Sequence, residues 1–297
     1  MEDLNHHHWD GDTDGTGWMQ RSLLWMTQGP GLWLFYGIVA VVVCFYILLR
    51  PRDTRAIYRL HRRLGRNRLH AAVAVYGNFF QFGCVIMDRF SAYGGRKFDI
   101  RFDEREAYTR LLQNESGIVQ LSSHVGNYEM AGYSLPYESK EMYALVYSGE
   151  TETVMENRRR IFQRHHIRMV PVKEDLSHLF ILNDALEHGN TASLPADRVF
   201  GSPKYFSIPF LGRDARFPKG PFALAVKRQV PVVAMFVLKQ PHLRYSIHYR
   251  ELRLNADESL LPAAVQMRRL AEKYTVELEK IVRAYPSQWF NFFDFWM

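Results

Sequence analysis

The sequence predicts an α/β fold, in which a sandwich of helices around a mixed sheet follows one N-terminal transmembrane helix. Three features of the 297 residues support this prediction. Short apolar runs alternate with helical patterns after residue 96, as is typical of α/β domains. Residues 22–49 contain no charged side chain. The charges on the two sides of that stretch have opposite sign, so the formal net charge of +7 is distributed unevenly.

The composition excludes several other classes of protein. With 47% hydrophobic and 14% aromatic residues, the chain can bury a large core, which excludes a disordered protein. Its two cysteines are too few for a disulfide-stabilised scaffold. The length fits one sizeable domain with a membrane attachment better than several small domains.

The first predicted element is a transmembrane helix over Pro30–Leu49. A helix of roughly 20 residues, at ~1.5 Å rise per residue, crosses a ~30 Å hydrocarbon core. A cleaved signal peptide is disfavoured, because it would need a basic start and a small-residue cleavage site. Here the preceding segment is acidic and the run ends in Leu-Leu-Arg-Pro-Arg. A buried core helix is the other alternative.

The charge pattern predicts how this helix is oriented. Residues 1–21 hold five acids and one base, whereas residues 50–70 hold eight arginines against Asp53 alone. By the positive-inside rule, the C-terminal side of the helix faces the cytoplasm. The expected organisation is an acidic segment at 1–29, the transmembrane helix at 30–49, a basic juxtamembrane and interfacial helical region at 50–95, and a catalytic domain at 96–297.

The elements after the anchor follow from apolar periodicity. Residues 69–90 are expected to form a helix on the membrane surface or against the core, and their polar positions disfavour a second span. Strands are expected at 118–121, 142–147, 168–172, 191–194, 230–238 and 245–249. Helices are expected near 103–114, 127–134, 152–165, 176–188, 220–228 and 259–284. In such a fold, sites form where strand ends meet helix starts.

The most informative stretch is GIVQLSSHVGNYE, residues 117–129. An apolar strand ends in two serines, His124 follows, and Gly126 turns the chain toward a helix that carries Glu129. A carboxylate that accepts the Nδ1–H of a histidine fixes its tautomer and leaves Nε2 free to act as a general base. A five-residue spacing would separate the two side chains by about 140° on one regular helix. They can meet only if His124 lies on a loop and the chain bends at Gly126.

Two alternatives accompany this interpretation. His124 could cap a helix beside an unrelated Glu129. A serine nucleophile at Ser122 or Ser123 is disfavoured, because adjacent residues on a strand end point apart and no Gly-X-Ser-X-Gly sequence occurs.

The stretch SSHVGNYE resembles the His-X4-Asp/Glu motif of the lysophospholipid acyltransferase superfamily. Its His-Φ-Gly-Asn-aromatic-Glu form is similar to that of bacterial lipid A biosynthesis (late) acyltransferases. Two further blocks occur in the same order as in that family. The run from Pro195 to Val233 is similar to its second block, and YPSQW at 285–289 is similar to its Tyr-Pro-Glu-Gln-Trp ending.

The resemblance implies an acyltransferase-type α/β sandwich that transfers a fatty acyl group from a thioester to a hydroxyl. His124 would be the general base and Glu129 its orienting partner, without cofactor or metal. Backbone N–H groups near Gly126 or Gly220 are candidate oxyanion or phosphate donors. Asn127 and Gly220 are also counted among substrate-binding candidates.

One position departs from the family's pattern. An Arg-Pro pair common in the family is replaced here by Val146-Tyr147-Ser148-Gly149. Its task would pass to other arginines, which also suit docking of an acidic acyl carrier protein or lipid phosphates. A solvated helix face is the alternative reading of this group: Arg158, Arg159, Arg160 and Arg164. Asp197 is either a second site carboxylate or a turn residue, and Arg198 is a candidate contact of the acceptor.

The expected activity is that of a membrane-bound O-acyltransferase in the cell inner membrane of a Gram-negative bacterium. The enzyme would be single-pass with its catalytic domain in the cytoplasm, and it would acylate a lipid A precursor or related lipid. The acceptor could instead be an aminolipid, a lysophospholipid or a polyene-type lipid. A non-catalytic lipid-binding protein of the same fold is the rival from another class. No nucleic-acid partner is expected, because the basic excess is local.

Overall fold

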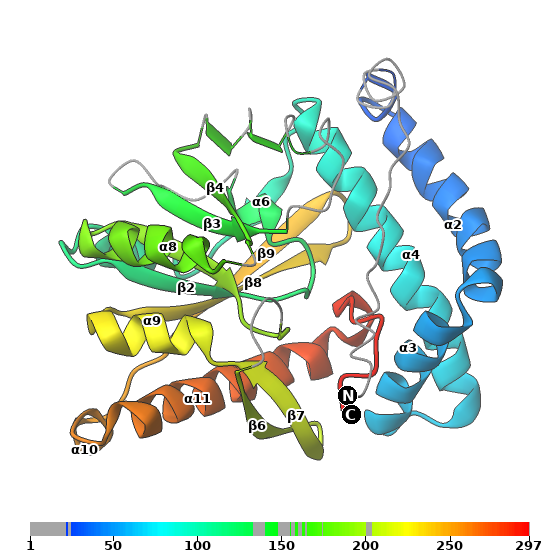
Figure 1. The fold of residues 1–297 in the computed structure, drawn as a ribbon. Coiled ribbons are helices and arrows are strands. Elements are labelled where there is room, and N and C mark those ends of the chain that lie inside the picture. Colours follow the sequence, from blue (N-terminus) through cyan, green and yellow to red (C-terminus); the bar gives the residue numbers. More distant parts are fainter. Residues whose placement is uncertain are drawn as a thin grey trace.

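A seven-stranded mixed sheet forms the centre of the computed structural model (Figure 1), which describes residues 22, 25–132, 140–147, 155, 158–159, 162–163, 165–173, 175–199 and 204–296. The strand order is β1-β9-β8-β2-β5-β3-β4, and every neighbouring pair is parallel except β8–β9. The strands are β1 Asp99–Arg101, β2 Ile118–Ser122, β3 Met142–Val146, β4 Ile167–Pro171, β5 Thr191–Pro195, β8 Val232–Gln240 and β9 Arg244–Glu251. The predicted mixed sheet is confirmed, and its six expected strands are all present.

Strand β8 shows how the sequence forms this sheet. Its apolar side chains alternate between the two faces, as the two-residue period of a strand requires. Val232, Ala234 and Phe236 belong to one core cluster, whereas Val233 and Met235 belong to the other. The continuous apolar run therefore corresponds to a central strand that is buried on both faces.

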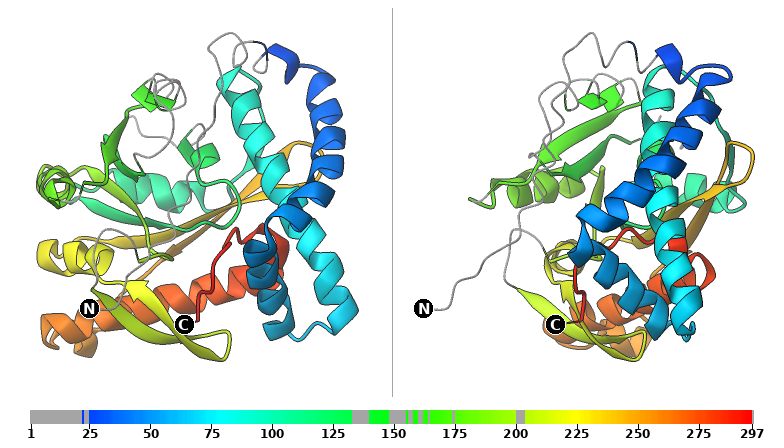
Figure 2. Two further views of the ribbon diagram at one scale, coloured as in Figure 1. Left: turned by 45° about the vertical axis from the view of Figure 1, so that its right-hand side comes forward. Right: turned by 90° about the vertical axis from the view of Figure 1, so that its right-hand side faces the viewer.

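Helices cover both faces of the sheet, which makes the predicted sandwich (Figures 1 and 2). One core cluster joins the sheet to α8 Ser177–Glu187, α9 Gly220–Arg228 and α11 Ala263–Ala284. The other joins it to α5 Arg105–Leu112 and α6 Glu129–Gly132.

Three parts of the fold differ from the sequence prediction. The helix expected at 259–284 is two helices, α10 Ala256–Ser259 and α11, because Pro262 lacks the N–H that a continuous helix needs. Strand β1 was not predicted, nor was the separate antiparallel hairpin of β6 Tyr205–Phe210 and β7 Arg213–Pro218. Most of the helix expected at 152–165, and the end of the one expected at 127–134, lie outside the described residues.

Three N-terminal helices form a separate layer beside the sheet (Figures 1 and 2). They are α2 Gly31–Leu49, α3 Pro51–Arg63 and α4 Arg68–Tyr93. By length and composition, both α2 and α4 could cross a membrane, whereas the sequence predicted only one such helix. The most apolar window of α2 is 17% buried and that of α4 is 39% buried, because α4 packs between α2 and the rest of the protein. The outer face of α2 exposes large apolar side chains, among them Trp33, Leu34, Val41, Phe45 and Leu48.

A buried carboxylate joins this layer to the sheet. Asp88 of α4 is fully buried and forms an ion pair with Lys239 of β8. It also accepts hydrogen bonds from the hydroxyls of Tyr36 on α2 and Tyr245 on β9. Asp88 therefore links α2, α4 and two strands at one point.

Candidate active site

The parallel pairing of β2 and β5 brings two predicted site residues together. Ser122, the last residue of β2, lies opposite Pro195, the last residue of β5. His124 and Asp197 each follow two residues later, at the same edge of the sheet. Residues 73 apart in sequence thus become neighbours, at the strand ends where sites form in α/β folds.

Asp197 holds His124 by two contacts. Its Oδ1 lies 2.9 Å from the Nδ1 of His124, and its Oδ2 accepts the backbone N–H of the same residue at 2.9 Å. Because an ionised carboxylate can only accept hydrogen bonds, Nδ1 carries the proton. Nε2 is then the nitrogen with a lone pair. The imidazole is 28% exposed and the carboxylate 1%, so a buried acid orients a histidine that solvent can reach.

The electrostatics of this pair suit a general base. Burial opposes ionisation of Asp197, but the neighbouring His124, its hydrogen bonds and the charge of Arg198 lower the pKa of the carboxyl to about 2. Burial lowers the pKa of His124 below its usual value, the charge of Arg198 acts in the same direction, and Asp197 opposes both. The imidazole is therefore neutral at pH 7, as a base must be.

The expected pairing of Glu129 with His124 is wrong in the structure. Glu129 is 2% exposed and points into a cluster of its own. Its Oε1 lies 3.0 Å from Arg158 and 3.3 Å from Arg89, and its Oε2 accepts the hydroxyl of Tyr93 at 2.6 Å. Burial would raise the pKa of Glu129, but the two guanidinium groups hold it below its usual value. The bend at Gly126 directs this carboxylate toward α4 and not toward the imidazole.

The turn at Gly126 and Asn127 does not supply free oxyanion donors. The N–H of Gly126 donates to Gln288 O at 2.8 Å, and that of Asn127 donates to Val237 O at 2.7 Å. Asn127 is fully buried, so its side chain does not offer the exposed contact expected for substrate binding. Gly126 has φ +65°, and a Cβ there would lie 2.0 Å from Val237 O, so only glycine fits.

The predicted arginines and Gly220 occupy different environments. Arg158 is 4% exposed and belongs to the Glu129 cluster, so it fits neither docking of a carrier protein nor the alternative of a solvated helix face. Arg159 is exposed, while Arg164 lies outside the described residues, as does Arg160. Arg198 donates to Phe290 O beside Asp197. Gly220 begins α9, and a Cβ there would meet no atom within 4 Å, so open space lies over that helix start.

Three residues of the site were missed by the sequence reasoning. Trp289 is 1% exposed, and its indole Nε1 donates to Asp197 Oδ2 at 3.3 Å. Arg89 and Tyr93 of α4 contact Glu129. The signal that could have indicated Arg89 is a charged pair, Asp88-Arg89, inside an otherwise apolar helix. No local pattern relates Trp289 to Asp197, which is 92 residues away.

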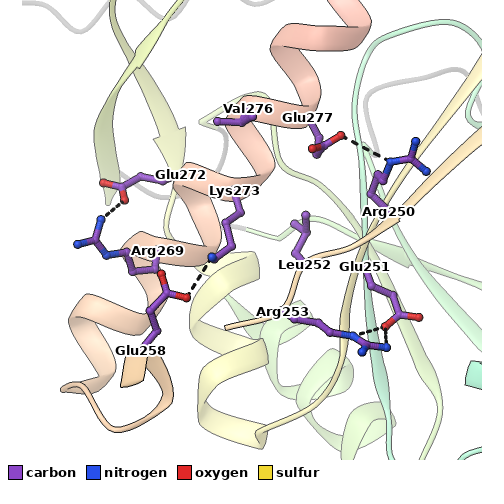
Figure 3. A pocket seen from close by; sticks show the side chains of 10 residues that line it. All are labelled: Arg250, Glu251, Leu252, Arg253, Glu258, Arg269, Glu272, Lys273, Val276 and Glu277. Atoms are coloured by element: carbon purple, nitrogen blue, oxygen red, sulfur yellow. Dashed lines mark hydrogen bonds and ion pairs between the residues drawn. The ribbon is translucent and has the colours of Figure 1, made fainter. Parts of the chain in front are cut away.

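A surface depression of about 480 Å³ lies between the end of β9 and α11 (Figure 3). Its charged side chains neutralise one another, as in the Arg253–Glu251, Lys273–Glu258 and Arg269–Glu272 pairs (Figure 3). Neither His124 nor Asp197 lines it. Within the part of the chain that the structure describes, no group of three or more His, Cys, Asp or Glu side chains could hold a metal ion.

Comparisons with known proteins concern the same part of the chain. Residues 78–297 match the model of a family described as bacterial lipid A biosynthesis acyltransferase. Among solved structures, the chain is similar to the crystal structure of the 1-acyl-sn-glycerophosphate (LPA) acyltransferase, PlsC, from Thermotoga maritima. The identity is 15%, the coverage is 88% of this chain and 98% of that one, and the TM-score is 0.36, too low to support further inference. No curated protein sequence matches the chain.

Proposed function

Because the chain belongs to the bacterial lipid A biosynthesis acyltransferase family, we propose that it transfers a fatty acyl group from an acyl thioester to a hydroxyl of a lipid A precursor or related lipid. Lipid acyltransferase activity follows from the family. To this activity the proposal adds the identity of the catalytic residues, of the acyl donor and of the lipid acceptor. The observation that carries it is the contact between His124 Nδ1 and the buried carboxylate of Asp197.

His124 acts in this mechanism as the general base. With Nδ1–H donating to Asp197, Nε2 takes the proton of the acceptor hydroxyl while the oxygen attacks the thioester carbonyl carbon. The tetrahedral intermediate carries its negative charge on the former carbonyl oxygen. As it collapses, the C–S bond breaks and the imidazolium returns the proton to the leaving thiolate. The products are an ester and a thiol, and no covalent acyl-enzyme forms.

Asp197 and Glu129 have separate tasks in this proposal. Asp197 holds the tautomer and stabilises the imidazolium that forms during transfer. Glu129 neutralises two arginines between α4 and the segment that carries Arg158. Oxyanion stabilisation then comes from donors other than Gly126 and Asn127, whose N–H groups are already bonded.

The acyl donor in this proposal is acyl carrier protein. Exposed arginines suit an acidic carrier, and Arg159 is the described member of the predicted group that is exposed. The acceptor is a membrane lipid, which agrees with the apolar helices beside the catalytic domain.

The proposed location is the inner membrane, with α2 as a single pass and the catalytic domain in the cytoplasm. The apolar outer face of α2 supports contact with lipid. Helix α3, which follows the C-terminal end of α2, carries exposed arginines, as the positive-inside rule requires of the cytoplasmic side. The hydroxyl of Tyr36 on α2 donates to Asp88 near the end of α4. If α2 spans the membrane, the end of α4 must therefore lie in the membrane beside it, or this hydrogen bond must break. Labelling of Trp25→Cys, at an exposed position before α2, from the outer side only would support the single pass. Labelling from the cytoplasmic side would overturn it.

The function is tested by acyl transfer in membranes that contain the full chain. The donor is labelled acyl carrier protein or, in a parallel assay, labelled acyl-coenzyme A, and the acceptors are a lipid A precursor, an aminolipid and a lysophospholipid. We expect transfer to the lipid A precursor, and a loss of about 100-fold or more in His124→Ala. Arg213→Ala, an exposed arginine of β7, serves as the control.

Each possible failure has its own meaning. Undiminished transfer by His124→Ala would overturn the mechanism. Transfer only to the aminolipid or the lysophospholipid would overturn the acceptor, and equal use of acyl-coenzyme A would overturn the donor. If no acceptor is acylated at all, the proposed reaction would be overturned in favour of the non-catalytic alternative.

A further inference from the structure

A segment near the C-terminus threads between α4 and the loop that carries His124. We call residues 286–291 the C-terminal strap. It begins with a short 3-10 helix, Pro286–Gln288, and continues extended through Trp289. Its Gln288 is 7% exposed, and Trp289 and Phe290 are buried as well.

The strap binds the backbone of the catalytic loop on three successive residues. Phe290 N–H donates to His124 O at 2.9 Å, Val125 pairs with Trp289 in an antiparallel bridge, and Gly126 N–H donates to Gln288 O at 2.8 Å. The strap therefore acts as an added strand that fixes where His124 leaves the sheet.

The strap also reaches the carboxylate side of the pair. The indole of Trp289 donates to the same Asp197 oxygen that accepts the N–H of His124, and Arg198 donates to Phe290 O. A second clamp lies on β8, where the Gln288 amide exchanges two hydrogen bonds with the backbone of Lys239, at 2.8 and 2.9 Å. The position of the strap is thus fixed independently of the loop that it holds.

The other side of the strap rests on α4. Asn78, fully buried, donates to Trp289 O at 3.2 Å, and the rings of Phe82 and Phe290 lie 5.2 Å apart. The contacts run without a gap from α4 through Asn78 and Trp289 to Asp197.

We infer that the strap positions the catalytic pair, with Trp289 as a positioning residue that sets the charge distribution on Asp197, and that Asn78 couples the pair to α4. This inference rests on the proposed function, because it assigns Asp197 the task of orienting His124. It does not depend on which lipid is the acceptor.

The test compares two buried tryptophans in the full chain. Trp289→Phe removes the N–H that bonds Asp197, whereas Trp296→Phe removes one that bonds the backbone carbonyl of Phe210 at 2.9 Å. We expect Trp289→Phe to lower kcat about 10-fold with little change in KM. Without the indole, more of the carboxylate charge acts on His124 and raises its pKa. The acidic limb of the pH profile of kcat/KM, where His124 becomes protonated, then moves to higher pH. Trp296→Phe should leave that limb in place.

The coupling to α4 has its own pair of variants. Asn78→Leu removes the bond to the strap, whereas Tyr76→Phe on the same helix removes a bond to Ala40 O on α2. We expect kcat to fall in Asn78→Leu only, with both proteins retained in the membrane fraction.

Thermal unfolding of all four variants separates misfolding from mispositioning. The inference is overturned if Trp289→Phe and Trp296→Phe lose activity alike, or if neither moves the acidic limb. Failure of the proposed function looks different, because the wild-type protein itself would then transfer no acyl group, or His124→Ala would remain fully active.

Discussion

Asp197 and Glu129 are buried carboxylates that follow neighbouring strands along the chain but have different partners. The oxygens of Asp197 face His124 and the indole of Trp289, whereas those of Glu129 face two arginines and a tyrosine. The short spacing along the chain predicted that Glu129, five residues from His124, would be the carboxylate that contacts the imidazole. The parallel pairing of β2 with β5 brings Asp197 to that place instead.

Replacing Asp197 should change the pH dependence of the reaction. Asp197 raises the pKa of His124, opposing burial, so Asp197→Asn lowers that pKa further. The acidic limb of kcat/KM, expected below pH 6.5 in the wild type, should move to lower pH. The rate should still fall by about 100-fold, because the tautomer is no longer held. A pH profile of acyl transfer measures both effects, and a limb that moves upward would contradict the assignment.

Replacing Glu129 should chiefly affect stability. Glu129→Gln leaves Arg89 and Arg158 without their buried counter-charge, and breaking such a pair costs about 3–5 kcal/mol. Denaturant unfolding in detergent measures the loss. In whatever fraction remains folded, the acidic limb should stay where it is in the wild type. Movement of that limb in Glu129→Gln would return Glu129 to the role of orienting partner.

The helices and strands show which parts of a fold a sequence can predict. Among the six expected strands, β2 and β8 are buried apolar runs, and β9 alternates buried residues with more exposed ones; both patterns indicate a strand in a sequence. Strand β1 has only three residues, too few to show a period. The β6–β7 hairpin contains prolines and exposed arginines, and such a sequence is more typical of a loop than of a strand. His124 and Asp197 were both predicted as candidate site residues, but their pairing was not, because they lie 73 residues apart in the chain. The contact of Phe290 N–H with His124 O joins residues still farther apart.

The turn after β2 gives a prediction about packing. Gly126 has φ +65°, and in Gly126→Ala the new Cβ would lie 2.0 Å from Val237 O. Because this oxygen belongs to the backbone of β8, the clash is relieved only if the main chain shifts. Gly212→Ala is the matched control, because its φ is +80° but a Cβ there meets nothing within 4 Å. We expect the control to cost about 1–2 kcal/mol of unfolding free energy from backbone strain alone. Gly126→Ala should cost more and also lower acyl transfer. Equal losses would mean that the loop moves aside.

Asp88 connects the layer of N-terminal helices to the sheet. It accepts hydrogen bonds from α2 and β9 and pairs with Lys239 of β8. Asp88→Asn should cost about 3–5 kcal/mol, because Lys239 loses its buried counter-charge. Tyr36→Phe, which removes one hydroxyl only, should cost about 1 kcal/mol. Unfolding midpoints in detergent compare the two, and a larger loss in Tyr36→Phe would contradict this account.

The connections between the N-terminal helices are short, so α2 is closely tied to the rest of the protein. Only Arg50 separates α2 from α3, and residues 64–67 separate α3 from α4, which itself packs against the C-terminal strap. In the proposed membrane arrangement, the rest of the protein therefore cannot move freely relative to α2. Rigid packing then fixes the depth of His124 relative to the lipid headgroups, so the proposed acceptor must present its hydroxyl at that one depth.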